Sequence, residues 1–188
     1  MEKELITSVI ETLERGGTLL YPTDTIWGIG CDATCFSAVE RLYAIKKRDH
    51  SKSMLVLCAD MAMVEQYVSH IGDRERQLLD AERATTVVLP MEIKRLACSL
   101  PAADGTIGVR IPRMAFCHEL LTAFGRPIVS TSANFSGQPS PKCFSDIDTE
   151  LVQRVDFCVP SGYEEERCER GSRIVKLLPD GGIQILRE

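Results

Sequence analysis

The chain has 188 residues, of which 44% are hydrophobic and 26% are charged, and its formal net charge is -5. This length and composition are typical of one globular domain that buries a core without covalent staples, so we expect a single domain over 1–188. The negative charge argues against a protein that works mainly by non-specific contacts with nucleic-acid phosphates, although it is compatible with a local basic groove.

The eight cysteines form no recognisable framework. The nearest pair is Cys31 and Cys35, and no histidines cluster beside them, so neither a zinc site nor a set of disulfides is predicted. The first residues lack the apolar core of a secretion signal, and no run approaches the roughly 20 apolar residues of a membrane span. We therefore expect a reduced, soluble, cytoplasmic protein without a metal site of its own.

The first part of the chain predicts alternating helices and strands. Apolar residues recur at helical spacing over 5–13, and a glycine pair predicts the end of that helix. A buried strand is expected over 18–21, followed by a polar turn and a return strand that reaches Gly30. A second helix is expected over 36–46, with Phe36 in its apolar stripe.

The same alternation continues through the middle of the chain. A short buried strand is expected over 55–57, and Asp60 is a suitable N-cap for the helix that follows. A charged helix over 73–83 and a strand over 86–90 come next. The stretch 91–105 is loop-like, with only a weak apolar pattern.

The last third of the chain predicts a strand over 107–111, a helix over 116–124 and a helix followed by a strand over 144–159. The polar stretch 161–171 is expected to be an exposed loop. Two apolar strands over 174–177 and 183–186 flank a Pro-Asp-Gly-Gly sequence, which is typical of a hairpin.

One stretch, GRPIVSTSANFSGQPSP at 125–141, combines an apolar pair with small polar residues. We expect Ile128-Val129 to end a buried strand and the residues after it to form a loop. Small hydroxyl and amide side chains with glycine let a ligand approach the backbone closely. Such a loop after a strand is a usual place for a small-molecule site, and the alternative is an ordinary turn.

A basic cluster of Lys46, Arg48 and Lys52 lies between the second helix and the next strand. Such a cluster is often solvated surface charge, but fixed cations are also what a triphosphate requires. The chain has neither a Walker A loop nor a GxGxxG sequence, and its three histidines are scattered without a triad setting. Nucleotide binding would therefore need another scaffold.

Several blocks together resemble the Sua5/YciO/YrdC family over nearly the whole chain, in order and spacing. A final Arg187 matches the closing strand of that family. The matching blocks are YPTDTIWGIGCDA at 21–33, IKKRDHSKSM at 45–54, TVVLP at 86–90, VRIP at 109–112, VSTSANFSGQPSP at 129–141 and GSRIV at 171–175.

The resemblance implies an α+β (mixed α/β) fold: a single domain with a twisted mixed sheet, flanking helices and a concave polar groove. It also implies a nucleotidyltransferase, an L-threonylcarbamoyladenylate synthase. Such an enzyme condenses L-threonine, bicarbonate and ATP and releases pyrophosphate, in the first step of the tRNA modification t6A at adenosine 37. Mg²⁺ would arrive with ATP, held mostly by phosphates and water.

Site residues follow from the resemblance. The triphosphate would be held by Lys46, Arg48 and Lys52, to which the catalytic role falls. Thr23, Ser130 and Ser172 would contact threonine or its carbamate, and Trp27 or Tyr21 could wall the pocket. The nucleotide would be bound by Arg48, Lys52, Thr86, Ser132, Asn134, Ser140 and Arg187.

Departures from the family pattern occur at three places. Arg83-Ala84 stands near the position of a usual Gly-Pro pair, Ser53 replaces a usual proline, and Arg173 replaces a common threonine. The chain resembles the short family form, whose product passes to separate t6A transfer proteins.

Two alternatives stay open from the sequence. One is a non-catalytic RNA- or ribosome-associated module on the same fold. The other is the related carbamoyl-adenylate chemistry of hydrogenase-cofactor maturation, which in relatives belongs to much longer chains. Weak contact with RNA and a homodimer also stay open.

Overall fold

A computed structural model describes residues 2–68, 71–90, 95–164, 170–178 and 180–188. The α-helices are α1 (Glu2–Glu14), α2 (Phe36–Lys46), α3 (Met61–Tyr67), α4 (Asp73–Leu79), α5 (Ala115–Phe124) and α6 (Thr149–Arg154). The strands are β1 (Thr18–Tyr21), β2 (Gly28–Cys31), β3 (Leu55–Leu57), β4 (Thr85–Pro90), β5 (Thr106–Arg110), β6 (Ile128–Ser132), β7 (Phe157–Cys158), β8 (Arg173–Leu177) and β9 (Ile183–Arg187). Short 3-10 helices span Phe144–Asp146 and Ser161–Tyr163.

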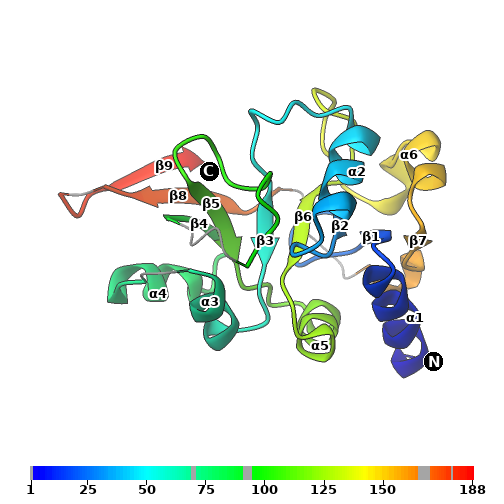
Figure 1. Ribbon diagram of the computed structural model, residues 1–188, viewed down its shortest axis with the longest axis horizontal. Helices are drawn as coiled ribbons and strands as arrows, with labels where there is room; N and C mark the ends of the chain where they lie inside the picture. The colour runs from blue at the N-terminus through cyan, green and yellow to red at the C-terminus, as the bar shows by residue number, and fades with distance from the viewer. Residues whose placement is uncertain (1, 69–70, 91–94, 165–169, 179) are drawn as a thin grey trace.

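Within the described residues the strands form one mixed sheet in the order β7-β1-β2-β6-β3-β5-β4-β8-β9 (Figure 1). Among the described strands, three neighbouring pairs are parallel (β1 with β7, β3 with β5, β4 with β8), and the other five are antiparallel. Helices α1, α3, α4 and α5 lie along the lower side of the molecule in Figure 1, and α2 and α6 lie above the β1–β2 end. The mixed α/β expectation is confirmed.

Strand register separates a row of core residues from a row on the opposite face of the sheet. Val87, Val109, Val56 and Val129 are paired across four neighbouring strands and are all buried. One residue along, the paired row is Val88, Gly108, Leu55 and Ser130. Because successive side chains of a strand point to opposite faces, the first row packs in the core and the second faces the other way. This second face carries the pocket described below.

Helix boundaries follow the sequence signals closely. The carboxylate of Asp60 accepts a hydrogen bond from the backbone N of Met63 at 2.8 Å, so it caps α3 as predicted. Gly125 ends α5 with φ at 69°, a left-handed conformation that glycine adopts without strain. No helix of the described residues is long and apolar enough to cross a bilayer.

Three sequence expectations were wrong in detail. Phe36 is 52% exposed and does not belong to the apolar face of α2, whereas Lys46 at the end of that helix is buried. Helix α4 ends at Leu79 rather than near residue 83. Strand β6 does not end at Val129, because its next residues pair with two neighbours: Ser130 with Leu55 of β3 and Ser132 with Gly28 of β2.

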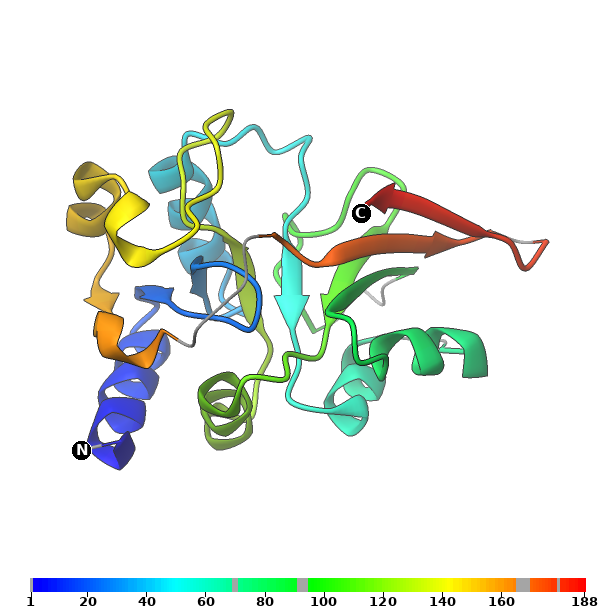
Figure 2. The ribbon, with the colours of Figure 1, turned by 180° about the vertical axis from the view of Figure 1, so that it is seen from behind.

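The β8–β9 hairpin projects from the body of the molecule at the end of the sheet, as Figure 2 shows from behind. Its predicted strands are confirmed, although residue 179 of the predicted turn lies outside the described residues, as do 91–94 and 165–169 of the two predicted loops. The hairpin carries Arg187 back toward the middle of the sheet.

Candidate active site

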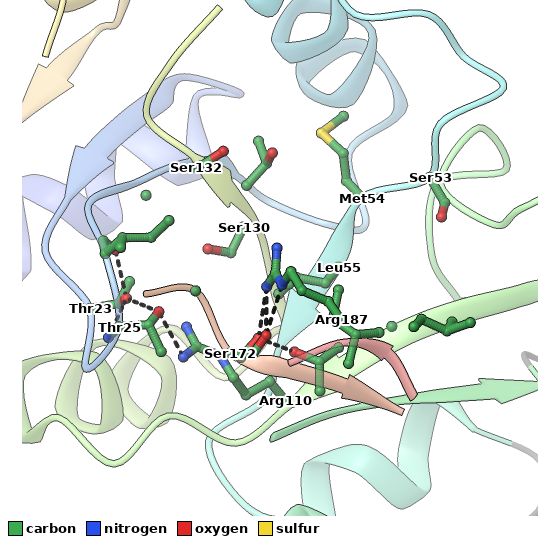
Figure 3. Close-up of a pocket in the computed structure, with 18 of the residues that line it drawn as sticks. Thr23, Thr25, Ser53, Met54, Leu55, Arg110, Ser130, Ser132, Ser172 and Arg187 are labelled. Atoms are coloured by element: carbon green, nitrogen blue, oxygen red, sulfur yellow. Dashed lines mark hydrogen bonds between the residues drawn. The ribbon is translucent and has the colours of Figure 1, made fainter. Parts of the chain in front are cut away.

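A cavity of about 320 Å³ opens on the polar face of the sheet (Figure 3). Its floor includes the second row described above, where there is no room for a side chain at Gly108: a Cβ there would lie 2.9 Å from Cγ2 of Thr86. The lining residues are Thr23, Thr25, Ile26, Trp27, Gly28, Arg48, Ser53, Met54, Leu55, Thr86, Val88, Gly108, Arg110, Ser130, Thr131, Ser132, Gly171, Ser172, Ile174, Leu186 and Arg187.

The lining is electropositive. Among the described residues it contains three arginines, Arg48, Arg110 and Arg187, and no aspartate or glutamate. Hydroxyl groups from five different segments of the described chain also line the cavity, which gives it many hydrogen-bond donors. Guanidinium groups bind phosphates and carboxylates with directed hydrogen bonds, so the cavity is suited to an anionic ligand.

Arg48 reaches the cavity from the turn after α2. Its Nε donates to the backbone oxygen of Lys52 at 3.0 Å, and its Nη2 donates to that of Ser53 at 2.9 Å. These bonds fold the 49–53 segment around the guanidinium. Burial lowers the pKa of Arg48 from its ordinary value, but an arginine remains charged.

Arg187 lies over the backbone at the start of β8. Its Nε and Nη2 donate to the carbonyl oxygen of Ser172 at 2.9 and 2.8 Å. The hydroxyl of Ser172 is in turn 2.7 Å from that of Thr86. A Cβ at Gly171 would lie 2.8 Å from Nη2 of Arg187. Glycine at this position therefore leaves the space that the guanidinium occupies. Burial and the nearby charge of Arg110 both lower the pKa of Arg187.

The turn after β1 contributes two threonines. The Thr23 hydroxyl donates to the backbone oxygen of Ile26 at 2.8 Å and lies 2.9 Å from the Thr25 hydroxyl. Nη1 of Arg110 donates to Thr25 Oγ1 and to Asp24 Oδ1, each at 3.0 Å. Figure 3 shows Thr25 and Arg110 meeting at one side of the cavity and Arg187 at the other.

Lys46 lies beneath the cavity wall rather than in it. Its Nζ donates to the carbonyl oxygens of Ser132 and Asn134, the second at 2.8 Å. Burial, with a smaller contribution from the charge of Arg48, lowers the pKa of Lys46 to about 7. The Asn134 amide donates to the backbone oxygens of Phe135 and Gln138, while its buried Oδ1 has no hydrogen-bond partner among the described residues.

The fold brings most of the predicted site residues into one cavity. Trp27 also lines it, whereas the buried Tyr21 does not. The predicted residues in the lining are Thr23, Arg48, Thr86, Ser130, Ser132, Ser172 and Arg187.

Four predicted residues are not in the lining: Lys46, Lys52, Asn134 and Ser140. Lys46 and Asn134 donate hydrogen bonds to backbone oxygens at the end of β6 and in the segment after it, and so hold this segment in place. The other two are exposed on segments beside the site.

Arg110 also lines the cavity, although the sequence did not predict it as a site residue. It ends β5 within the VRIP block, and its side chain is only 3% exposed. A charged residue inside an otherwise apolar strand is a detectable signal, because a buried charge requires a partner. Its partner Asp24 is distant in sequence, so the pairing itself is not readable from the chain.

The three departures from the family pattern leave the cavity intact. Ser53 lines it and supplies a carbonyl oxygen to Arg48. Arg83 and Arg173 lie together outside it, within 2.7 and 3.8 Å of the carboxylate of Glu188.

The described residues contain no group of three or more His, Cys, Asp or Glu side chains that could hold a metal ion. No disulfide joins the cysteines of the described residues, and Cys168 lies outside these residues.

Comparison with known proteins agrees with these features. The family Sua5_yciO_yrdC, described as "Telomere recombination", matches residues 11–188. Curated relatives named threonylcarbamoyl-AMP synthase include that of Stenotrophomonas maltophilia, 34% identical over 83% of this chain and 86% of its own length. The one of Bos taurus is 29% identical over 98% of this chain and 67% of its own length.

Solved structures show the same fold. Escherichia coli YciO superposes with a TM-score of 0.84 at 24% identity, covering 100% of this chain and 90% of that one. P. abyssi Sua5, solved in complex with L-threonine, gives 0.89 at 23% identity and covers 100% of this chain, which spans 54% of that protein. Full-length HypF in a phosphate- and nucleotide-bound form gives 0.84 at 25% identity over 97% of this chain and 28% of its own. The matching blocks, the sheet and the arginine-lined cavity together place the chain in the Sua5/YciO/YrdC family.

Proposed function

We propose that this protein is a threonylcarbamoyl-AMP synthase. It would join L-threonine, bicarbonate and ATP into L-threonylcarbamoyladenylate and release pyrophosphate, the first step of t6A formation in tRNA. The observation that carries the proposal is one cavity lined by three arginines and several hydroxyl groups, in a chain whose curated relatives bear that name. Two anionic substrates need such a cavity.

Arg48 and Arg187 suit the triphosphate. Both guanidiniums are fixed by backbone carbonyls, so they meet a ligand without losing further side-chain freedom. Thr86 and Ser132 would contact the nucleotide beside them. Lys52, exposed on the segment that Arg48 folds, would approach the phosphates from outside.

Thr23, Ser130 and Arg110 suit the amino acid. The guanidinium of Arg110 would take the threonine carboxylate, because a carboxylate matches its paired donors. Ser172, whose hydroxyl lies within hydrogen-bond distance of Thr86 and Arg187, would contact the carbamate.

The chemistry requires alignment more than a strong base. The threonine amine attacks carbon dioxide derived from bicarbonate and loses a proton, which gives a carbamate. A carbamate oxygen then attacks the α-phosphorus of ATP, and the bond to the β-phosphate oxygen breaks to release pyrophosphate. Fixed guanidiniums stabilise the charge that develops on the leaving group. Because the cavity offers hydroxyls and cations but no carboxylate, Mg²⁺ would come with ATP, held by its phosphates and by water.

We infer a supporting role for Lys46 and Asn134 in place of direct contact with ATP. They hold the segment after β6, next to Ser132, the last residue of that strand, which lies in the cavity wall. Transfer proteins for the t6A pathway would receive the product, in the cytoplasm, and no observation here favours the RNA-binding alternative.

The test is pyrophosphate release by the purified protein with ATP and Mg²⁺. Release that requires both threonine and bicarbonate is the expected result. Release without threonine, or none although both substrates bind, would contradict the proposal. Replacement of threonine by serine or valine in the same assay would define the amino-acid specificity.

A further inference from the structure

The three arginines of the cavity differ in whether a neighbouring carboxylate compensates their positive charge. Within the described residues, Arg48 is held by backbone carbonyls and Arg187 by the carbonyl and hydroxyl of Ser172, which are neutral groups. Arg110 instead forms an ion pair with Asp24, 3.0 Å away. The two side chains are only 3% and 13% exposed, so water screens this pair weakly. Arg48 and Arg187 therefore keep their positive charge for a ligand, whereas the charge of Arg110 is nearly compensated.

Asp24 lies behind Arg110, outside the cavity lining. Its Oδ2 accepts a hydrogen bond from the backbone N of Arg113 at 3.1 Å, so both of its oxygens are engaged. Thr25 holds the same Nη1 of Arg110 from the side. The buried Nε of Arg110 has no hydrogen-bond partner among the described residues. The guanidinium is thus fixed along one edge and keeps a donor on the other.

We infer that Asp24 determines which anion each arginine of the cavity accepts. By compensating Arg110, it makes that arginine suitable for a group with one negative charge and unfavourable for a polyphosphate, which is drawn to Arg48 and Arg187. The assignment of the single charge to an amino-acid carboxylate rests on the proposed function. A carboxylate still gains directed hydrogen bonds from the free edge of Arg110, whereas a chain of several charges gains little from a compensated pair.

The first test compares wild type with Asp24→Asn, using inorganic triphosphate as the probe. Without the carboxylate, Arg110 becomes an uncompensated cation in a cavity of low dielectric. We expect triphosphate to bind about tenfold more tightly and to become competitive with threonine. Asp24→Glu, which restores the charge, should return both properties toward wild type. Asp104→Asn, which removes an exposed aspartate paired with Lys176, is the matched control and should change neither.

Asp24→Asn leaves a buried arginine unpaired, and the variant protein could fail to fold for that reason. A second variant keeps the test valid in that case. The double variant Asp24→Asn/Arg110→Gln replaces the ion pair by two neutral amides. Its triphosphate affinity should stay within about twofold of wild type, because the pair contributes little net charge. Its threonine affinity should fall about 10-fold or more, because the donor to the carboxylate is gone.

Two results would overturn the inference: unchanged triphosphate affinity in folded Asp24→Asn, or a double variant that loses triphosphate as strongly as Arg187→Gln does. If Asp24 had a merely structural role, Asp24→Asn would lower the melting temperature and weaken the binding of both triphosphate and threonine. Triphosphate would then not become competitive with threonine. The triphosphate measurements involve no turnover. A wild-type protein without threonine-dependent pyrophosphate release would therefore remove the proposed function, while these comparisons would still decide the charge argument.

Discussion

Nζ of Lys46 donates a hydrogen bond to the carbonyl oxygen of Asn134 at 2.8 Å, while the backbone oxygen of Lys46 accepts one from Ser136 at 2.9 Å. The end of α2 and the segment after β6 are therefore joined by one residue, through both its side chain and its backbone. Because Lys46 is 1% exposed, its side chain supports the wall of the cavity from behind.

Replacement of Lys46 by Met should change how stability depends on pH. The pKa of Lys46 is about 7 in the folded protein and 10.5 ordinarily, so between these values the unfolded chain binds a proton that the folded one releases. The stabilising contribution of wild-type Lys46 should rise with pH across that window, by up to about 1.4 kcal/mol per pH unit, and be smallest below it. Urea unfolding of both proteins at several pH values measures the difference.

The control for this experiment is Lys47→Met, at the exposed neighbour that pairs with Glu150. The free energy of unfolding of Lys47→Met should differ from that of wild type by a nearly constant amount over the same pH range. A difference for Lys46→Met that is also constant would contradict the burial of the ammonium.

Arg48→Ala should reduce kcat/KM for pyrophosphate release by about 100-fold or more, because it removes a fixed cation from the developing charge. Lys52→Ala should cost less, since the Lys52 side chain is not part of the lining and its backbone oxygen still accepts from Arg48. Circular dichroism should show both variants folded. Wild-type turnover in Arg48→Ala would remove that residue from the phosphate site.

Gly171→Ala should raise the KM for ATP about tenfold, because the new Cβ would lie 2.8 Å from Nη2 of Arg187 and displace the guanidinium. Gly162→Ala is the matched control, since a Cβ there meets nothing within 4 Å. Steady-state kinetics with ATP varied at saturating threonine would measure the effect. Equal KM values for the two variants would show that Arg187 does not contact the nucleotide.

Thr86→Val should lower the free energy of unfolding by about 1–2 kcal/mol, because the Ser172 hydroxyl loses a buried partner at 2.7 Å. Thr86→Ser keeps the hydroxyl and should recover most of that loss. Denaturant unfolding compares the three proteins. If Thr86→Val were as stable as wild type, a water would have to replace the missing hydroxyl, and the two variants should then differ little in turnover.

Much of the secondary structure is local information, and the sequence predicted it. The apolar spacing of α1, the cap at Asp60, the glycine that ends α5 and the β8–β9 hairpin are each encoded within a few residues. Element ends were less certain: β6 extends to Ser132 because β2 and β3 pair with it, and those partners are remote in sequence.

The candidate site was predictable as a set of residue types on particular loops, which the family blocks supplied. The directions in which these side chains point were not predictable from the sequence, as the end of α2 illustrates. Lys47 adopts a left-handed conformation with φ at 51°, and Arg48 N bonds back to the oxygen of Tyr43. This turn sends Lys46 inward and Arg48 into the cavity.

The sequence by itself therefore determined the element order, the family and the chemical character of the site, because these depend on local periodicity and on residue identity. Only the tertiary structure decided which cations face the ligand and which are compensated. Asp24 and Arg110 are separated by 86 residues, and their pairing depends on how β5 packs beside the turn after β1. Long-range contacts of this kind arise when the sheet assembles, and no local pattern in the chain encodes them.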